Sequence, residues 1–152
     1  MGKGAYAEVF VAVEKETQTS FAVKHILDRS KMRRCNGRNF LVDEIANLKR
    51  LADAPHVVRF RDYFIESKSC FVVLELMEGG ELFDRIIEKQ IFSEQEARDA
   101  CHCALSALNY MHEKRIVHRD LKPENLMLSV SHKRNLNPVL DSSLNPPSDS
   151  SH

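Results

Sequence analysis

Short apolar runs separated by polar connections occupy the first half of the chain. Residues 8–15 and 20–27 are rich in β-branched and aromatic side chains, and the polar Glu-Thr-Gln-Thr between them predicts a hairpin. Residues 56–64 and 70–76 have the same character and predict two more strands. Between these pairs, residues 40–51 carry apolar side chains at helical spacing, namely Leu41, Ile45, Leu48 and Leu51. The pattern predicts the order strand, strand, helix, strand, strand.

Helical patterns follow in the second half. Residues 80–89 form a short amphipathic segment, and Ser93 with Glu96 three positions later forms a capping box that opens a helix over about residues 94–114. From residue 129 onward Ser, Asn and Pro dominate, and the apolar residues show no helical or strand periodicity. Residues 129–152 are therefore expected to be a loop and disordered tail. Together the patterns predict an α+β fold.

The formal net charge is zero, so the overall charge does not favour binding to nucleic acid or to an anionic membrane. No apolar run is long enough to cross a bilayer and no signal-peptide pattern is present, so a cytoplasmic or nuclear location is expected. The four cysteines are then expected to be reduced. The segment Cys101-His102-Cys103 lacks the spacing of a zinc knuckle, and helix packing is favoured over a metal site.

The segment His-Arg-Asp-Leu-Lys-Pro-Glu-Asn, residues 118–125, carries the strongest chemical signal. Asp120 can orient a hydroxyl and accept its proton, Lys122 can neutralise a transferring phosphoryl group, and the Asn125 amide oxygen can ligate Mg²⁺. The segment matches the protein-kinase catalytic-loop motif H-R-D-L-x-x-x-N at every fixed position.

Upstream segments resemble further kinase motifs. Residues 2–9 resemble the glycine-rich loop, where Gly2 and Gly4 would let backbone amides approach phosphates, although Ala7 replaces the third glycine. Residues 21–24 resemble the strand that carries the phosphate-binding lysine, and period-2 alternation places Ala22 and Lys24 on one sheet face.

Glu44 lies on the predicted helix over residues 40–51, and the resemblance implies that this carboxylate pairs with Lys24. The alternative is that Glu44 is a surface helix charge. Residues 71–83 are similar to the strand, hinge and helix that hold adenine in kinases. The resemblance implies Leu74 as gatekeeper, adenine hydrogen bonds from the Glu75 carbonyl and the Met77 amide, and Glu81 at the ribose.

The resemblance also implies that Val9 and Met127 sandwich the adenine ring, although core packing is the simpler explanation for each apolar residue. It covers residues 2–128 and is greatest for the calcium/calmodulin-dependent kinase group. It implies a partial catalytic domain over residues 1–128. Residues 1–77 would be the small lobe, an antiparallel sheet with one helix and the hinge, and residues 78–128 would begin a mainly helical large lobe.

The activity that the resemblance implies is transfer of the γ-phosphoryl group of Mg-ATP to serine or threonine in a protein. Asp120 would position the hydroxyl, Lys122 would steady the phosphoryl group and Asn125 would hold metal. Glu81 and Glu124 match acidic positions that receive arginine N-terminal to the target residue, which implies an Arg-x-x-Ser/Thr substrate.

The sequence also departs from the kinase pattern. No D-F-G, activation segment or A-P-E is recognisable, and Ser142 and Ser143 stand where Phe and Gly would follow the metal-binding aspartate. Asp141 follows Asn125 by 16 positions and is the remaining candidate for that aspartate. An incomplete catalytic domain is expected.

Two alternatives remain open: a catalytically inactive truncated isoform that binds nucleotide or docks on a kinase, and a splicing or gene-model product. The predicted long helix should expose an apolar surface that a regulatory protein could cover, formed by Ala97, Ala100, Leu105, Leu108 and Met111.

Overall fold

A computed structural model describes residues 7–26, 40–66, 69–129 and 138–141. The predictions for Gly2 and Gly4 therefore lie outside the described residues. The chain divides into two compact units. Unit 1 comprises Met1–Lys49, Phe60–Leu76 and Ser143–His152, and unit 2 comprises Arg50–Arg59 and Met77–Ser142.

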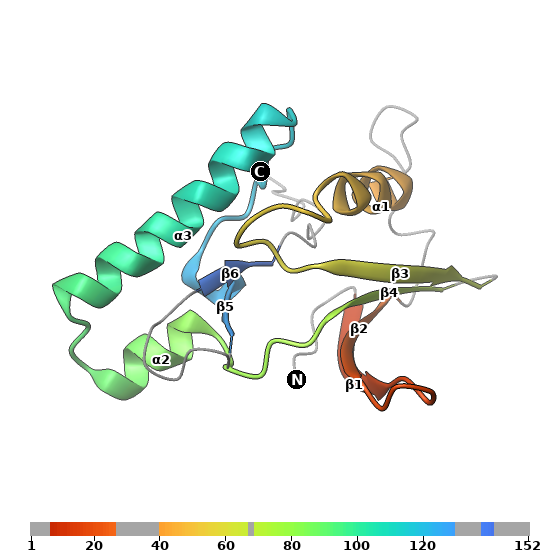
Figure 1. Cartoon of the computed structure of the whole chain (residues 1–152), viewed down its shortest axis with the longest axis horizontal. Coiled ribbons are helices and arrows are strands. Elements are labelled where there is room, and N and C mark those ends of the chain that lie inside the picture. Colours follow the sequence, from red (N-terminus) through yellow and green to blue (C-terminus); the bar gives the residue numbers. More distant parts are fainter. Residues whose placement is uncertain (1–6, 27–39, 67–68, 130–137, 142–152) are drawn as a thin grey trace, which may run out of the picture. The chain divides into compact units, whose positions relative to one another are not determined.

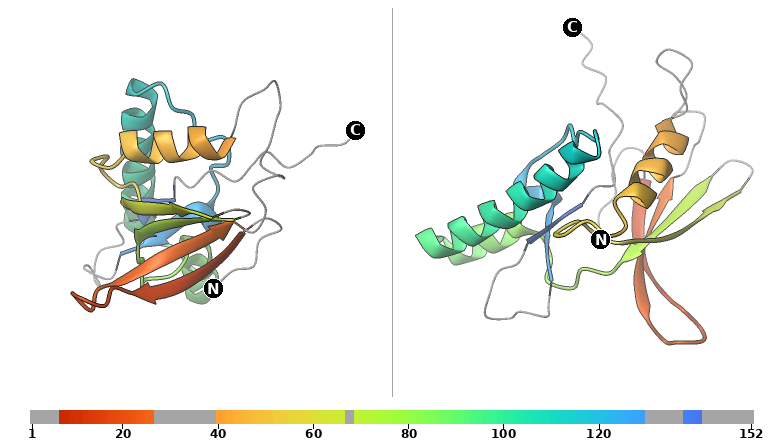
Figure 2. Two further views of the ribbon diagram at one scale, coloured as in Figure 1. Left: turned by 90° about the vertical axis from the view of Figure 1, so that its right-hand side faces the viewer. Right: turned by 45° about the horizontal axis from the view of Figure 1, so that its top comes forward.

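Unit 1 contains a four-stranded antiparallel sheet in the order β1-β2-β4-β3 (Figure 1). The strands are β1 (Ala7–Val13), β2 (Ser20–Ile26), β3 (Phe60–Ile65) and β4 (Cys70–Glu75). The predicted hairpin is present, and Figure 2 shows β1 at the outer edge of the sheet beside β2.

Helix α1 (Phe40–Arg50) lies on one side of this sheet (Figure 1). Its predicted apolar positions are buried, because Leu41 and Leu48 are 2% exposed and Ile45 is 6% exposed. Burial of these side chains together with the inward face of the sheet gives unit 1 its apolar core.

Unit 2 contains α2 (Leu82–Lys89), α3 (Glu94–Glu113), the 3₁₀ turn η1 (Pro123–Asn125), and the short strands β5 (Leu126–Leu128) and β6 (Pro138–Leu140). The two strands pair antiparallel. Its core gathers apolar residues from most of these elements and from the segment before β3. They are Leu51, Ala54, Val57, Leu82, Ala100, Ala107, Met111, Ile116, Leu126, Leu128 and Leu140. The predicted α+β class is confirmed.

Part of the apolar side of α3 is buried, although the sequence analysis expects this side to be exposed. Ala100 is 6% and Met111 is 0% exposed, because both pack in the core that β5 and β6 complete. Leu105, at 65% exposed, fits the expectation. The exposed apolar surface is therefore smaller than predicted.

The prediction that residues 129–152 contain only loop and tail is wrong at residues 138–140. Strand β6 pairs with β5, where Leu126 lies opposite Leu140. On its other side the Leu140 amide donates to the His56 carbonyl at 2.8 Å, and the Val58 amide donates to the Leu140 carbonyl at 3.0 Å. A three-residue strand is too short to show a period, and these distant partners hold it in place.

Gly79 permits a close backbone approach to β5. Its amide donates to the Leu128 carbonyl at 2.9 Å, and the Leu128 amide donates to the Gly80 carbonyl at 2.8 Å. A Cβ on Gly79 would lie 2.3 Å from the Leu128 oxygen, whereas a Cβ on Gly80 would meet nothing within 4 Å. At position 80 glycine is favoured for a different reason, because the backbone φ there is +77°.

Gly79→Ala is expected to destabilise unit 2 by about 1–3 kcal/mol, because the backbone must move to relieve the contact with Leu128. Gly80→Asn is the matched control, since asparagine tolerates positive φ and has space there. Urea unfolding followed by circular dichroism measures both variants. Equal stability of the two would contradict the close approach.

The predicted capping box opens α3. The Ser93 hydroxyl accepts from the Glu96 amide at 3.2 Å, and the Glu96 carboxylate accepts from the Ser93 amide at 3.1 Å. Hydrogen bonds from the Lys89 side chain and then from Ser93 lower the pKa of Glu96 from an ordinary 4.5 to about 2. The charged carboxylate is therefore favoured in the folded chain.

Because the Glu96 pKa is lower in the folded state, its contribution to stability is complete above pH 4.5 and is lost as pH falls toward about 2. Glu96→Gln is expected to reduce the fall in melting temperature across this window. Glu94→Gln serves as a control, because the Glu94 side chain is 89% exposed and pairs with Arg98 in the same helix. An unchanged pH profile in Glu96→Gln would contradict the assignment.

Candidate active site

Unit 1 contributes a buried ion pair between a strand and a helix. Lys24 Nζ on β2 lies 3.4 Å from Glu44 Oε1 on α1, and the two side chains are only 9% and 3% exposed. The alternative that Glu44 is a surface charge is thus wrong. Removing two charges from water is expensive, so such a pair is weak evidence for stability and instead marks a candidate functional site.

The face of the sheet that carries Lys24 also carries the unit 1 residues predicted to contact adenine. Val9 lies opposite Lys24 in the β1–β2 register, and Ala22 lies opposite Leu74 in the β2–β4 register. Because paired residues share a face and alternate residues share it too, all four belong to one surface. Glu75 ends β4 beside Leu74.

The catalytic-loop motif lies in unit 2, and His118 organises it. The ring is 3% exposed; Nδ1 accepts from the Asp120 amide at 3.3 Å, and Nε2 lies 2.7 Å from the Asp141 carbonyl oxygen. Both contacts are hydrogen bonds in the tautomer that carries its proton on Nε2. His118 thereby connects the backbones of Asp120 and Asp141, a positioning role that the sequence analysis did not assign, although the histidine stands in the recognised motif.

Asn125 closes the loop around Asp120. Its Nδ2 donates to the Asp120 carbonyl at 2.6 Å and to the carboxylate Oδ2 at 3.0 Å. Lys122 Nζ lies 3.2 Å from the same Oδ2. The Asp141 amide donates to the Asn125 carbonyl at 2.9 Å. The structure thus gathers Asp120, Lys122, Asn125 and Asp141 into one hydrogen-bonded group.

Local sequence explains how the loop turns. Pro123 stands at the start of η1, where its missing amide costs no hydrogen bond, and the Asn125 amide donates to the Lys122 carbonyl at 3.0 Å. Arg119 has a φ of +68°, which turns the chain just before Asp120. Strand β5 begins directly after η1, so the loop is anchored at its C-terminal end.

The remaining predicted contacts of unit 2 are also placed. Glu81 forms an antiparallel bridge with Met127, and both side chains are partly buried. Met77 is partly buried, whereas Glu124 is exposed on η1. Glu81 and Met127 therefore lie side by side at the start of α2.

The candidate metal ligands of this site are oxygen atoms, which suit magnesium. Asn125 directs its amide nitrogen to Asp120, so its Oδ1 is the atom that can bind a cation, and Asp141 adds a carboxylate. Mg²⁺ prefers such oxygen ligands and completes its shell with water and phosphate oxygens. In the part of the chain that the structure describes, no three His, Cys, Asp or Glu side chains form a metal cluster. The Asn125 Oδ1 and the Asp141 carboxylate therefore fit a Mg²⁺ that takes its remaining ligands from water and phosphate oxygens.

Residues 1–138 match the family model described as protein kinase domain. The chain belongs to the protein kinase family. The kinase sheet of unit 1 and the catalytic loop of unit 2 are the parts that the sequence resemblance implied. Among the described residues of this kinase, no helix is long and apolar enough to cross a membrane.

The relatives of this kinase include calcium/calmodulin-dependent and myosin light chain kinases. It is 41% identical over 130 residues to a probable myosin light chain kinase of Dictyostelium discoideum, covering 86% of this chain and 40% of that protein. It is 41% identical over 130 residues to calcium/calmodulin-dependent protein kinase type IV of Mus musculus, covering 86% of this chain and 26% of that protein.

A third relative is calcium/calmodulin-dependent protein kinase type 1 of Macrobrachium nipponense, 37% identical over 127 residues, covering 84% of this chain and 36% of that protein. The resemblance to the calcium/calmodulin-dependent group is thereby confirmed. The chain spans less than half the length of these relatives.

Proposed function

We propose that this kinase binds Mg-ATP and transfers its γ-phosphoryl group to serine or threonine in a protein. The observation that carries the proposal is the hydrogen-bonded group of Asp120, Lys122, Asn125 and Asp141. Phosphoryl transfer depends mainly on positioning and on neutralising charge, and this group brings together a base, a cation and two oxygen ligands.

Each side chain of the loop has a distinct role in the proposal. The Asp120 carboxylate orients the substrate hydroxyl and accepts its proton, while the Asn125 amide holds that carboxylate in place. Lys122, next to Asp120, offsets negative charge on the γ-phosphoryl group. Asn125 and Asp141 hold Mg²⁺, which when bound neutralises charge on the phosphates. The His118 ring contacts the backbones of both Asp120 and Asp141 and so positions them relative to each other.

Unit 1 supplies nucleotide contacts. Glu44 holds the Lys24 side chain in position, so that its ammonium can bind the α- and β-phosphates. Val9, Ala22 and Leu74 offer an apolar surface to adenine on the same face, and the Glu75 carbonyl accepts a hydrogen bond from its edge. The proposal assigns the remaining nucleotide contacts to residues of unit 2. The Met77 amide donates to adenine, Met127 contacts the ring and Glu81 binds the ribose.

The substrate class is proposed from the acidic residues near the loop. Exposed Glu124 and partly buried Glu81 can pair with arginine, which suits a basic residue N-terminal to the target. Relatives named as calcium/calmodulin-dependent protein kinases support a protein substrate. A nucleotide-binding module without transfer is the alternative, favoured by Ser142 and Ser143 in place of Phe and Gly.

A thermal-shift titration with ATP, with and without Mg²⁺, tests nucleotide binding. We expect stabilisation of about 2.7 kcal/mol at a hundredfold excess over Kd, because ligand binds only the folded chain. Asp141→Ala is expected to lose the magnesium-dependent part of the shift, since it removes a carboxylate ligand.

Asp99→Ala is the matched control, because it removes a carboxylate from α3, outside the catalytic loop. A melt that is indifferent to nucleotide would contradict the proposed function. A shift that is equal with and without Mg²⁺ would contradict the metal site at Asn125 and Asp141 while leaving nucleotide binding in place.

A further inference from the structure

The sheet of unit 1 has apolar side chains on both of its faces. Helix α1, the described helix of unit 1, lies on the face that carries Lys24, since Glu44 of α1 contacts Lys24. Strand alternation places the intervening positions on the opposite face, which we call the aromatic face. Its apolar members come from all four strands and are Phe10, Ala12, Phe21, Val23, Phe64, Phe71 and Val73. A sheet face that is left in water normally carries polar side chains, so this composition favours a binding surface.

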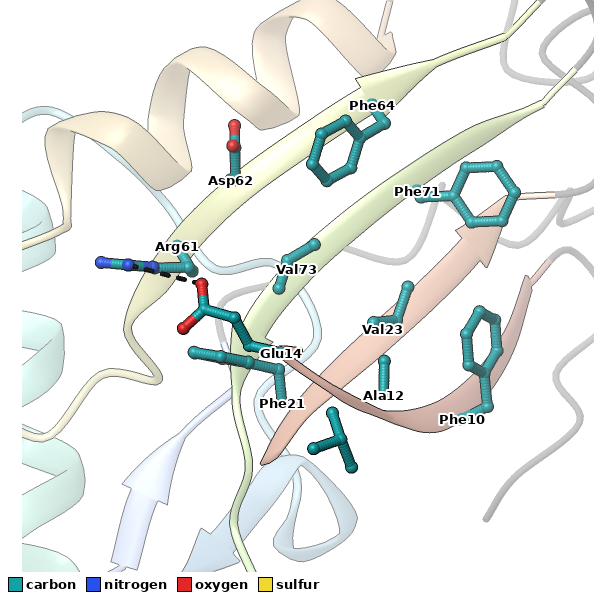
Figure 3. A pocket seen from close by; sticks show the side chains of 11 residues that line it. Phe10, Ala12, Glu14, Phe21, Val23, Arg61, Asp62, Phe64, Phe71 and Val73 are labelled. Atoms are coloured by element: carbon teal, nitrogen blue, oxygen red, sulfur yellow. Dashed lines mark ion pairs between the residues drawn. The ribbon is translucent and has the colours of Figure 1, made fainter. Parts of the chain in front are cut away.

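The aromatic face is hollowed into an open groove of about 620 Å³ (Figure 3). The residues that line the groove belong to unit 1, and they include the apolar members of the aromatic face. Phe64 on β3 is 56% exposed and Phe10 on β1 is 38% exposed, so both rings are accessible to another molecule. A groove of this size can hold several apolar side chains of a partner.

The chain's own Arg61 shows how one end of this groove holds a cation. The Arg61 guanidinium lies 5.9 Å from the centroid of the Phe21 ring, and its Nη2 lies 3.9 Å from Glu14 Oε1. The face of an aromatic ring attracts a cation, and a neighbouring carboxylate adds to the attraction. A ring and a carboxylate thus form a cation-binding pair at this end.

The other end of the groove repeats the combination of carboxylate and aromatic rings. Asp62 lies two positions before Phe64 on the same face of β3, and Phe71 lies opposite Phe64 on β4. His25 stacks on Phe71 with ring centroids 4.4 Å apart, which holds the Phe71 ring in place. Asp62 Oδ1 accepts from the Tyr63 amide at 2.8 Å, and within the described ranges Asp62 forms no ion pair. This end can therefore take a basic side chain from a partner.

We propose that the aromatic face binds a basic amphipathic helix of another protein. The helix lies across the strands, its apolar side chains enter the groove, and an arginine or lysine near one end pairs with Asp62 over the Phe64 ring. A helix with one apolar stripe commonly covers an apolar sheet face. The four strands of the sheet, about 4.8 Å apart, span roughly 14 Å, a length that about ten helical residues match.

The charges around the groove select a basic partner. Its lining contains the carboxylates of Glu14 and Asp62 and the guanidinium of Arg61, which already pairs with Glu14. Nucleic acids and anionic membranes require clustered basic residues, and the described lining does not supply them. Binding at the aromatic face needs no nucleotide, because this face lies opposite Lys24, so it can be measured separately from phosphoryl transfer.

Fluorescence anisotropy with two designed peptides tests the binding. Each peptide is a helix of about 14 residues with leucine in an i, i+3, i+4, i+7 pattern. One peptide carries arginine beside this stripe, and the other carries glutamate at the same positions. The wild-type chain is expected to bind the arginine peptide at least about tenfold more tightly than the glutamate peptide. No binding of the arginine peptide, or equal affinity for the two peptides, would overturn the proposal.

Substitutions on the two sides of β3 locate the binding site. Phe64→Ser is expected to weaken binding of the arginine peptide about tenfold, because it removes an exposed ring from the groove. Ile65→Ser is the matched control, since Ile65 is 47% exposed at the next position of the strand and lies on the other face. Its affinity is expected to equal that of the wild type. An equal loss in both variants, or no loss in Phe64→Ser, would refute binding at the aromatic face.

A charge reversal tests the position of the basic side chain. Asp62→Lys is expected to weaken binding of the arginine peptide and to strengthen binding of the glutamate peptide, each about tenfold. Glu16→Lys makes the same charge change in the turn between β1 and β2, outside the groove lining, and is expected to alter neither affinity by more than about twofold. Equal effects of the two reversals would contradict the pairing with Asp62.

Sedimentation of the chain without peptide distinguishes a second copy from a partner helix. The wild type and Phe64→Ser are expected to sediment alike, because the aromatic face is assigned to another protein. Self-association that is lost in Phe64→Ser and kept in Ile65→Ser would assign this face to a second copy of the chain and would overturn the proposal.

Discussion

Glu44→Leu is expected to destabilise unit 1 by about 3–5 kcal/mol, because it leaves the Lys24 ammonium buried without its carboxylate partner. The double variant Lys24→Met with Glu44→Leu is expected to recover most of this loss. Two apolar side chains of similar volume can replace a buried pair at little net cost. Urea unfolding of the wild type, both single variants and the double variant measures the coupling energy.

A surface ion pair supplies the control. Arg98 Nη2 lies 2.8 Å from Glu94 Oε1 on α3, and the two side chains are 64% and 89% exposed. Glu94→Leu is therefore expected to change the free energy of unfolding by less than about 1 kcal/mol. If Glu44→Leu cost no more than Glu94→Leu, the buried pair would not be formed in solution. Nucleotide-induced stabilisation should be lost in the double variant even though the fold is recovered, since Lys24 no longer binds phosphate.

Asp120→Asn is expected to lower the rate of peptide phosphorylation by about 10²- to 10⁴-fold, because the amide cannot accept the hydroxyl proton. The magnesium-dependent thermal shift with ATP should persist, because Asp120 is not one of the proposed metal ligands. The rate is measured with labelled ATP and a peptide that carries Arg-x-x-Ser.

Glu113→Gln provides the comparison, since Glu113 ends α3 and contacts Asn109 rather than the catalytic loop. Its rate is expected to equal that of the wild type. A rate for Asp120→Asn equal to the wild type would contradict the role of Asp120. A wild-type chain that binds Mg-ATP but transfers nothing would favour the nucleotide-binding alternative.

Much of the fold could be predicted because the relevant signals are local. The hairpin of β1 and β2, the apolar stripe of α1 and the capping box of α3 each depend on residues within one or two turns or strands. The buried pair of Lys24 and Glu44 needed the family resemblance as well, because strand alternation places Lys24 on a face but does not name its partner.

The sequence by itself determined the order of strands and helices through α3, the catalytic-loop motif and the set of candidate residues. Hydrophobic periodicity, helix capping and motif spacing depend on residues that are close together in the chain. Tertiary structure alone decided three further features. It placed β6 between β5 and the segment at His56 and Val58, connected His118 to Asp141, and buried Ala100 and Met111 under the short strands. Each depends on contacts between residues far apart in the chain, and such contacts leave no period or spacing in the sequence that could reveal them.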